Sequence, residues 1–296
     1  MKRKGIWFAL LAACLYALSA PLSKLLLENV PPTLMAGLLY LGAGLGMVPL
    51  LLATPKTKEE ERLCKSDIPY LVLMVVLDIA APILLLRGLK STSAAGVSLL
   101  NNFEIVATAL IAFLFFKETI SPRLWVGLAL VTLACGLLSW EGREELRFST
   151  GSMAVLGAAL CWGLENNCTR RLSDRNPLII VLIKGLCCGS GSLLLGLLLG
   201  ERTELSLSVL WALLLGAVAY GLSIFFYIYA QRFIGAARTG AFYAVCPFVG
   251  ALLSLLIFGQ LPSAFFIPAF LVMLAGAWFC LEGVSLRDLF GKGNTP

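Results

Sequence analysis

The amino-acid sequence predicts an all-α integral membrane protein with ten transmembrane helices arranged as two inverted five-helix repeats. Three observations predict this fold: 59% of the 296 residues are hydrophobic, only 14% are charged, and the apolar residues fall in long blocks. Blocks of about twenty apolar residues cross the roughly 30 Å hydrocarbon core of a bilayer as helices, which satisfy their own backbone hydrogen bonds. A soluble chain carries more charge, commonly about 25%.

The ten helices are expected, in chain order, at 5–27, 33–53, 68–89, 93–116, 123–139, 151–170, 177–199, 208–229, 235–258 and 263–281. The first block follows three basic residues and could pass for a secretory signal peptide. It is too long for one, lacks a clear cleavage site and is followed by further apolar blocks, so we expect it to be retained. The longest polar connection, 54–67, is too short to form a domain.

Lysine and arginine in the loops predict the orientation, because cytosolic loops of membrane proteins are enriched in them. With the N-terminus in the cytosol, the cytosolic side receives sixteen of these residues and the outer side six. We therefore expect a multi-pass protein of the cytoplasmic membrane, surrounded by lipid, with both termini cytosolic. The net charge of +6 then reflects membrane topology, and no basic stripe with interleaved aromatic residues indicates nucleic-acid binding.

An internal repeat relates the two halves of the chain. A shift of 146 positions aligns Pro31 with Pro177, and a shift of 142 aligns Glu118 with Gln260. An odd number of spans per half makes the second copy enter the membrane from the opposite side, and inverted repeats place a site near the midplane at their seam. The expected units are 1–140, 151–284 and a cytosolic tail at 285–296.

The residues around the fourth expected helix resemble a known family. Small residues open the segment, Asn101-Asn102-Phe103-Glu104 follow inside it, and Phe116-Lys117-Glu118 close it. This pattern is similar to an EamA domain of the drug/metabolite transporter superfamily, and a second, incomplete copy follows with Pro247 and Gln260. The resemblance implies two five-helix EamA repeats around a cavity lined mainly by the first, third, fourth, sixth, eighth and ninth helices.

Four ionisable residues lie deep inside expected spans: Asp78, Glu104, Glu165 and Lys184. Such residues are costly in a membrane and usually face partners, water or substrate. Asp78 and Glu104 are equidistant from Ser91, so an antiparallel hairpin of 68–89 and 93–116 would bring both carboxylates to one depth. Two such close acids cannot both be ionised in a low dielectric, so one could carry a proton.

Glu165 and Lys184 are likewise equidistant from the turn at Asp174 and would lie at one depth. Two interpretations stay open for this pair: a structural ion pair that holds helices together, or groups that bind substrate. Lys184 is also close enough to the cytosolic end to extend its amine toward water.

Polar side chains at helical spacing extend these sites into stripes that would face inward. The candidate substrate-binding residues are Tyr16, Ser19, Asp78, Asn101, Glu104, Trp162, Glu165, Lys184, Tyr220, Tyr227 and Tyr243. Hydrogen bonds between helices would need only serine and threonine, whereas tyrosines together with carboxylates favour a cavity for a solute with an apolar body.

Glycines recur in the second and seventh expected helices, which indicates close helix packing or a moving element. The sequence contains no histidine, no phosphate-binding loop and no D-x-x-D motif. We therefore expect no cofactor, no metal site, no ATP drive and no enzymatic activity.

The function that these observations predict is secondary transport of a small, amino acid-like amphipathic metabolite by alternating access. Export is favoured over uptake, and protons carried by Asp78, Glu104 or Glu165 are a further hypothesis. A lipid flippase on the same fold and, less favoured, an intramembrane enzyme are the alternatives. The chain is expected to act as a monomer or a homodimer.

Overall fold

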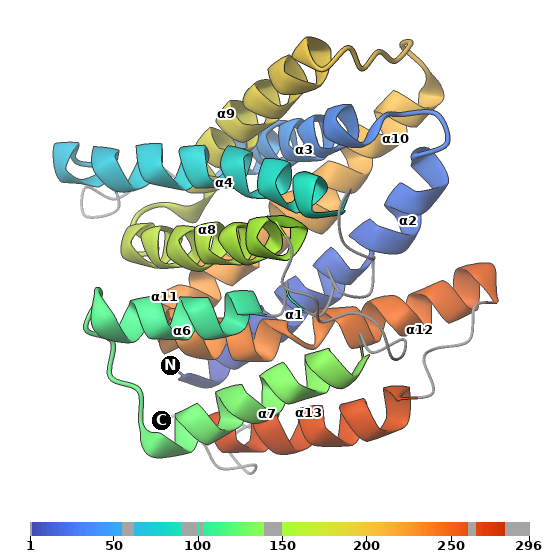
Figure 1. Cartoon of the computed structure of the whole chain (residues 1–296). Helices are drawn as coiled ribbons and strands as arrows, with labels where there is room; N and C mark the ends of the chain where they lie inside the picture. The colour runs from blue at the N-terminus through green and yellow to red at the C-terminus, as the bar shows by residue number, and fades with distance from the viewer. Residues whose placement is uncertain are drawn as a thin grey trace.

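The computed structural model describes residues 2–54, 62–89, 100, 103–138, 150–259 and 265–281, and the regular secondary structure within them is helical (Figure 1). Its elements are α1 (Lys2–Ala17), α2 (Ser19–Leu26), α3 (Pro32–Ala53), the 3-10 turn η2 (Lys65–Asp67), α4 (Ile68–Leu89), α6 (Phe103–Leu114), α7 (Pro122–Leu138), α8 (Thr150–Leu172), α9 (Pro177–Leu198), α10 (Leu207–Leu215), the π-helical η3 (Gly216–Leu222), α11 (Ser223–Tyr243), α12 (Cys246–Phe258) and α13 (Phe266–Cys280).

Local chemistry explains several helix ends. α3 and α9 begin at Pro32 and Pro177, where a missing N–H costs nothing because the first turn has no intrahelical acceptor for it. The side chain of Asn176 caps α9 by accepting a hydrogen bond from the amide of Leu178 at 2.9 Å. α12 ends at Gly259 with φ of 66°, a left-handed conformation that a residue without Cβ adopts at little cost.

Three of the expected helices are interrupted. The span at 5–27 divides at Leu18 into α1 and α2, and the span at 208–229 passes through the π-helical η3. The boundary expected between 229 and 235 falls inside α11, at Gly235, whose φ of 80° breaks the helical path. The next expected helix, 235–258, is therefore the last part of α11 followed by α12. Of the expected helix at 93–116, the structure describes residue 100 and then 103–116, and α6 ends at Leu114.

Membrane spans can be recognised in the described helices by length and composition. Five long apolar spans are present, Arg3–Ser23, Pro32–Ala53, Lys65–Leu85, Pro177–Leu198 and Leu207–Phe258, the last long enough for two crossings, and α6, α7 and α13 are shorter apolar helices. α8 is not among them because it carries the consecutive polar residues Glu165, Asn166 and Asn167, all of them buried inside the protein. Together these features describe an all-α membrane protein whose least apolar long helix lies inside the bundle.

The helices of the two halves pack in pairs that are related by exchange of the halves. α3 packs on α9, which are the second helices of the two repeats, and α7 packs on α13, which are the fifth. The contact of α4 with α8 has its counterpart in α11 with α1, and that of α6 with α8 in α12 with α1. The contact of α3 with η3 corresponds to that of α9 with α4. This pattern is what two structural repeats around a pseudo-two-fold axis produce.

The expected hairpin of 68–89 with 93–116 is wrong for the part that the structure describes. α8 lies between α4 and α6 and packs against both (Figure 1). A helix from the second repeat therefore occupies the place that sequence adjacency assigned to a direct contact. The consequence is that Asp78 on α4 and Glu104 on α6 face different sides of α8.

Glycines allow a close approach of α3 and α9. A Cβ atom at Gly185 would lie 2.3 Å from the backbone nitrogen of Gly44, and one at Gly44 would lie 3.0 Å from the nitrogen of Leu186. Close packing, one of the two interpretations of these glycines, is therefore present at this crossing. It brings the second helices of both repeats to the centre of the molecule.

Candidate functional site

A cavity of about 430 Å³ lies at the seam of the two repeats. It extends from Lys184 and Thr169 in the middle of the bundle toward the end that carries Pro32 and Leu195. Residues of α1, α3, α4, α6, α8, α9, η3 and α11 line it. The helices implied by the family resemblance are among these, and α3 and α9 are additional because their glycine contact places them at the centre.

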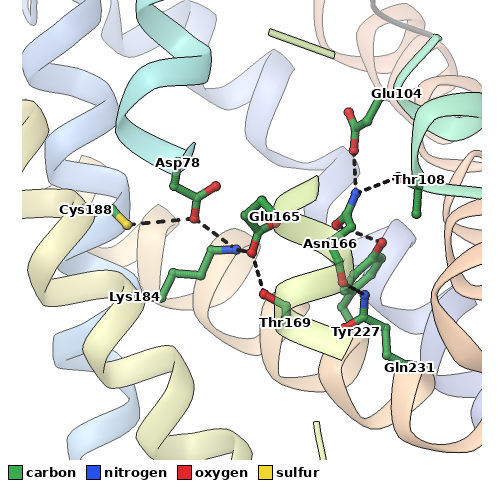
Figure 2. A network of polar contacts seen from close by, with 10 residues as sticks. All are labelled: Asp78, Glu104, Thr108, Glu165, Asn166, Thr169, Lys184, Cys188, Tyr227 and Gln231. Carbon is green, nitrogen blue, oxygen red and sulfur yellow. Dashed lines mark hydrogen bonds and ion pairs between the residues drawn. The ribbon is translucent and has the colours of Figure 1, made fainter. Parts of the chain in front are cut away.

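An ion cluster forms one wall of the cavity. The Nζ atom of Lys184 on α9 lies 3.0 Å from Oδ2 of Asp78 on α4 and 2.8 Å from Oε1 of Glu165 on α8 (Figure 2). The three residues are only 6%, 1% and 3% exposed, so an ammonium group at this depth needs the two acids beside it. The sequence-based pairing of Glu165 with Lys184 is present, with Asp78 as a second acid on the same amine.

Each acid of the ion cluster has a second donor of its own. The hydroxyl of Thr169, one helical turn after Glu165, donates to Glu165 Oε1. The thiol of Cys188, one turn after Lys184, lies 3.8 Å from Asp78 Oδ2. These donors orient both carboxylates independently of the lysine.

An amide cluster lies on the other side of α8, centred on Asn166 (Figure 2). Its Nδ2 atom donates to Oε1 of Glu104 at 3.0 Å and to Oγ1 of Thr108 at 3.2 Å, both on α6. Its Oδ1 atom accepts from the hydroxyl of Tyr227 at 3.1 Å, and its backbone carbonyl accepts from Gln231 at 2.8 Å. Glu104 is thus held by a neutral amide, whereas Asp78 and Glu165 are held by a cation.

Tyrosines form the remaining wall of the cavity. Ring centroids are 5.2 Å apart for Tyr16 and Tyr220, 5.7 Å for Tyr16 and Tyr243, and 4.9 Å for Tyr227 and Tyr243. Tyr40 on α3 extends the row, with its centroid 5.4 Å from that of Tyr220. Tyrosine rings offer apolar faces together with hydroxyl groups, so this wall suits a partly apolar solute.

Most of the candidate residues come together at this cavity. Its lining includes Tyr16, Asp78, Glu104, Trp162, Glu165, Lys184, Tyr220, Tyr227 and Tyr243. Ser19 is buried in α2 and is not among the lining residues, because the turn at Leu18 divides the helix that was expected to carry it beside Tyr16. Asn101 lies outside the described residues.

The close carboxylate pair of Asp78 and Glu104 is absent among the described contacts, because α8 separates their helices. Sequence reasoning also missed Asn166 and Tyr40, which both line the cavity. The signal for Asn166 was its place directly after Glu165 inside a span. Tyr40 offered a weaker signal, as a lone tyrosine in an otherwise apolar helix.

Polar contacts join the two repeats at the other end of the bundle. The Nε atom of Arg175, in the turn between α8 and α9, lies 2.8 Å from Oδ2 of Asp67, the last residue of η2. This hydrogen bond raises the pKa of the guanidinium group. Glu118 accepts hydrogen bonds from the amides of Ala236 at 3.0 Å and Ala237 at 3.3 Å, just after the break at Gly235. We call the pair Asp67–Arg175 and the Glu118 contacts the end clamp.

A helical bundle of two repeats, with a cavity at their seam that contains buried charged residues, is the architecture of a membrane transporter. The model of the EamA-like transporter family matches residues 3–140 and 149–281. The chain therefore belongs to the EamA-like transporter family, each match covering one of the two repeats.

Relatives and solved structures agree with this assignment. An uncharacterized transporter of Methanothermobacter thermautotrophicus (strain Delta H) is 29% identical over 297 residues, which cover 94% of this chain and 86% of the relative. The uncharacterized transporter YyaM of Bacillus subtilis (strain 168) is 24% identical, over 86% of each chain. A solved crystal structure superimposes with a TM-score of 0.79 at 18% identity, covers 93% of this chain and 95% of its own, and supports the fold alone.

Proposed function

We propose that this protein is a secondary transporter that exports a small, amphipathic, amine-bearing metabolite across the cytoplasmic membrane by alternating access. The observation that carries the proposal is the division of the cavity into an acidic wall, with Glu104 and the ion cluster, and a tyrosine wall. The acidic wall suits an ammonium group and the tyrosine wall suits an apolar body, as in an amino acid-like metabolite. The cation–π attraction of aromatic rings adds to the preference for a positive end.

Glu104 is the acid that we assign to the substrate's ammonium group. Its carboxylate accepts a hydrogen bond from the neutral amide of Asn166, at 3.0 Å, whereas Asp78 and Glu165 share Lys184. A carboxylate in a low dielectric gains most from a cation that arrives beside it. A proton is the other cation that Glu104 can accept, and competition between proton and amine would couple export to a proton gradient.

Alternating access is supported by the position of the cavity in the bundle. The cavity extends toward the end with Pro32 and Leu195, where Glu201 accepts hydrogen bonds from the Thr33 hydroxyl at 2.7 Å and the Leu34 amide at 3.0 Å, and the end clamp joins the repeats at the other end. The bias of lysine and arginine toward the loops around Arg175 supports a cytosolic position for the clamped end. The structure would then correspond to a state that releases substrate outward.

The substrate class is identified first by thermal-shift screening of the purified protein against amino acids, polyamines, purines and lipophilic cations. The compound that stabilises the protein most is then used, in labelled form, in proteoliposomes. We expect Glu104→Gln to lower its transport about a hundredfold, because the substrate's charge loses its partner, while the variant remains folded.

The matched control is Glu204→Gln, the same chemical change at an exposed loop position. It should transport at the unmodified rate. If Glu104→Gln transports as well as Glu204→Gln, Glu104 does not bind the substrate and the assignment fails.

A further inference from the structure

The ion cluster has the composition of a ligand site that is already filled. Asp78 and Glu165 come from different repeats and converge on one nitrogen atom, Lys184 Nζ, at 3.0 and 2.8 Å. All three residues line the cavity, so the ammonium position borders the space that a solute would enter.

The two acids are arranged to remain in place without the lysine. Thr169 donates to Glu165 and the Cys188 thiol approaches Asp78 at 3.8 Å, so each carboxylate keeps a donor from its own surroundings. The lysine side chain, by contrast, is a flexible four-carbon stem with a compact charge at its tip. Its departure would leave a preformed pair of acids facing the cavity.

We propose that Asp78 and Glu165 form a binding site for a primary ammonium group, and that its occupant alternates between Lys184 and the ammonium group of a solute. The proposal rests on the proposed function for its second occupant, and names that substrate class more narrowly: a primary amine with N–H donors. When no substrate is bound, Lys184 fills the site. Its charge compensates the two acids while the transporter changes between its two conformations. A solute amine that enters the cavity pairs first with Glu104 and then takes the place of Lys184 between Asp78 and Glu165.

Competition for one site predicts that a substitution in the site raises the affinity for an ammonium ion, where a substitution normally lowers it. Removal of Lys184 removes the competitor, so Lys184→Ala should bind a small primary ammonium ion more tightly than the unmodified protein does. If Lys184 were only structural, its loss would loosen the cavity and weaken binding. The probe is ethylammonium chloride, with tetramethylammonium chloride as the cation that lacks N–H donors.

The experiment is a titration of thermal unfolding in detergent at constant ionic strength. The melting temperature of Lys184→Ala should fall by roughly 10 °C, because two buried acids lose their cation. Ethylammonium should restore part of this loss, with an apparent affinity about tenfold or more above that for the unmodified protein. Tetramethylammonium should not. The matched control, Lys65→Ala, removes an exposed lysine and should gain no ethylammonium affinity.

Equal or weaker ethylammonium binding by Lys184→Ala overturns the proposal. If that variant unfolds on extraction, recovery of monodisperse protein is compared in the two salts. Recovery only with ethylammonium supports the ammonium site, and equal or failed recovery in both salts counts against it. The readout needs no transport, so it separates this proposal from the proposed function, which fails if no amine is transported by the unmodified protein.

Discussion

Asn166 is the residue through which α8 connects the acidic wall of the cavity to the tyrosine wall. It donates to Glu104 and accepts from Tyr227, while its neighbour Glu165 turns toward Lys184. Successive residues on a helix point about a quarter turn apart, so α8 can supply both clusters: it packs against α4 on one side and against α6 and α11 on the other, and its Glu165 meets Lys184 of α9. At the residue scale, the site depends on the two adjacent polar residues of α8, Glu165 and Asn166.

A comparison of two adjacent amides tests this role. Asn166 lines the cavity, whereas Asn167 donates to the backbone carbonyls of Thr108 at 3.0 Å and Gly163 at 2.8 Å and is not among the lining residues. Asn166→Ala should weaken substrate affinity about tenfold and also destabilise the protein, because Glu104 and Tyr227 lose their partner. Asn167→Ala should cost about 1–3 kcal/mol of stability without changing affinity.

The measurements are substrate affinity, by thermal-shift titration with the compound found in the screen, and melting temperature without substrate. Equal effects of both substitutions on affinity would show that the amides act only through helix packing. Asn166 would then have no direct place in the site.

At the scale of elements, the crossing of α3 and α9 determines how the second helices of the repeats reach the cavity. The backbone of Gly185 lies against that of Gly44, and Lys184 and Tyr40 are near this contact on the two helices. Tyr40 is nine residues beyond Pro31 and Lys184 is seven beyond Pro177, so the two lie two positions apart in the repeat. The crossing therefore brings a tyrosine and a lysine from the same part of the repeat into the wall.

A methyl group at this crossing should separate the helices. A Cβ atom at Gly185 would lie 2.3 Å from the nitrogen of Gly44, a distance that only backbone movement can relieve. Gly185→Ala should therefore destabilise the protein by about 1–3 kcal/mol and reduce transport, because the helices that carry Lys184 and Tyr40 move apart.

Gly240→Ala is the matched control, since a Cβ atom there has nothing within 4 Å. In a helix this change should be neutral or slightly stabilising. Thermal unfolding in detergent compares the two variants, and equal melting temperatures would refute the tight crossing.

At the scale of the whole molecule, the repeats are alike in packing and different in chemistry. The contact of α4 with α9 carries the pair Asp78–Lys184, and its counterpart, the contact of α3 with η3, carries the rings of Tyr40 and Tyr220 at 5.4 Å. Symmetric packing permits two related conformations that open to opposite sides. The chemical asymmetry gives the cavity one charged and one aromatic wall.

The end clamp should bias the equilibrium between these conformations. Asp67→Asn removes the ion pair with Arg175 and should favour the opposite state by about 1 kcal/mol, roughly a fivefold change in population. The reporter is Leu195→Cys, at the open end of the cavity, whose labelling by a membrane-impermeant thiol reagent is quantified by peptide mass spectrometry. We expect Asp67→Asn to slow this labelling.

Glu204→Cys, in the exposed loop after α9, serves as the control and should be labelled equally in both backgrounds. Unchanged labelling of Leu195→Cys after Asp67→Asn would mean that the clamp does not control access to the cavity. Faster labelling would assign the clamp to the opposite state.

The sequence by itself determined that the protein is an all-α membrane protein of two repeats, because apolar block length and internal similarity are local properties of the chain. It also indicated the buried ionisable residues, since a charge inside an apolar block is visible without a structure. The prediction that Glu165 and Lys184 lie at one depth succeeded because Glu165 is on α8 and Lys184 on α9, and these helices follow each other in the chain across a short turn.

Only the tertiary structure decided which of these residues meet. Asp78 contacts Lys184 rather than Glu104 because α8, from the other repeat, lies between α4 and α6. Contacts across the seam join residues far apart in the chain, and neither helical spacing nor distance from a turn carries information about them. The physical reason is that each buried charge takes the partner that interlocking of the repeats brings near it, and this interlocking is a property of both halves together.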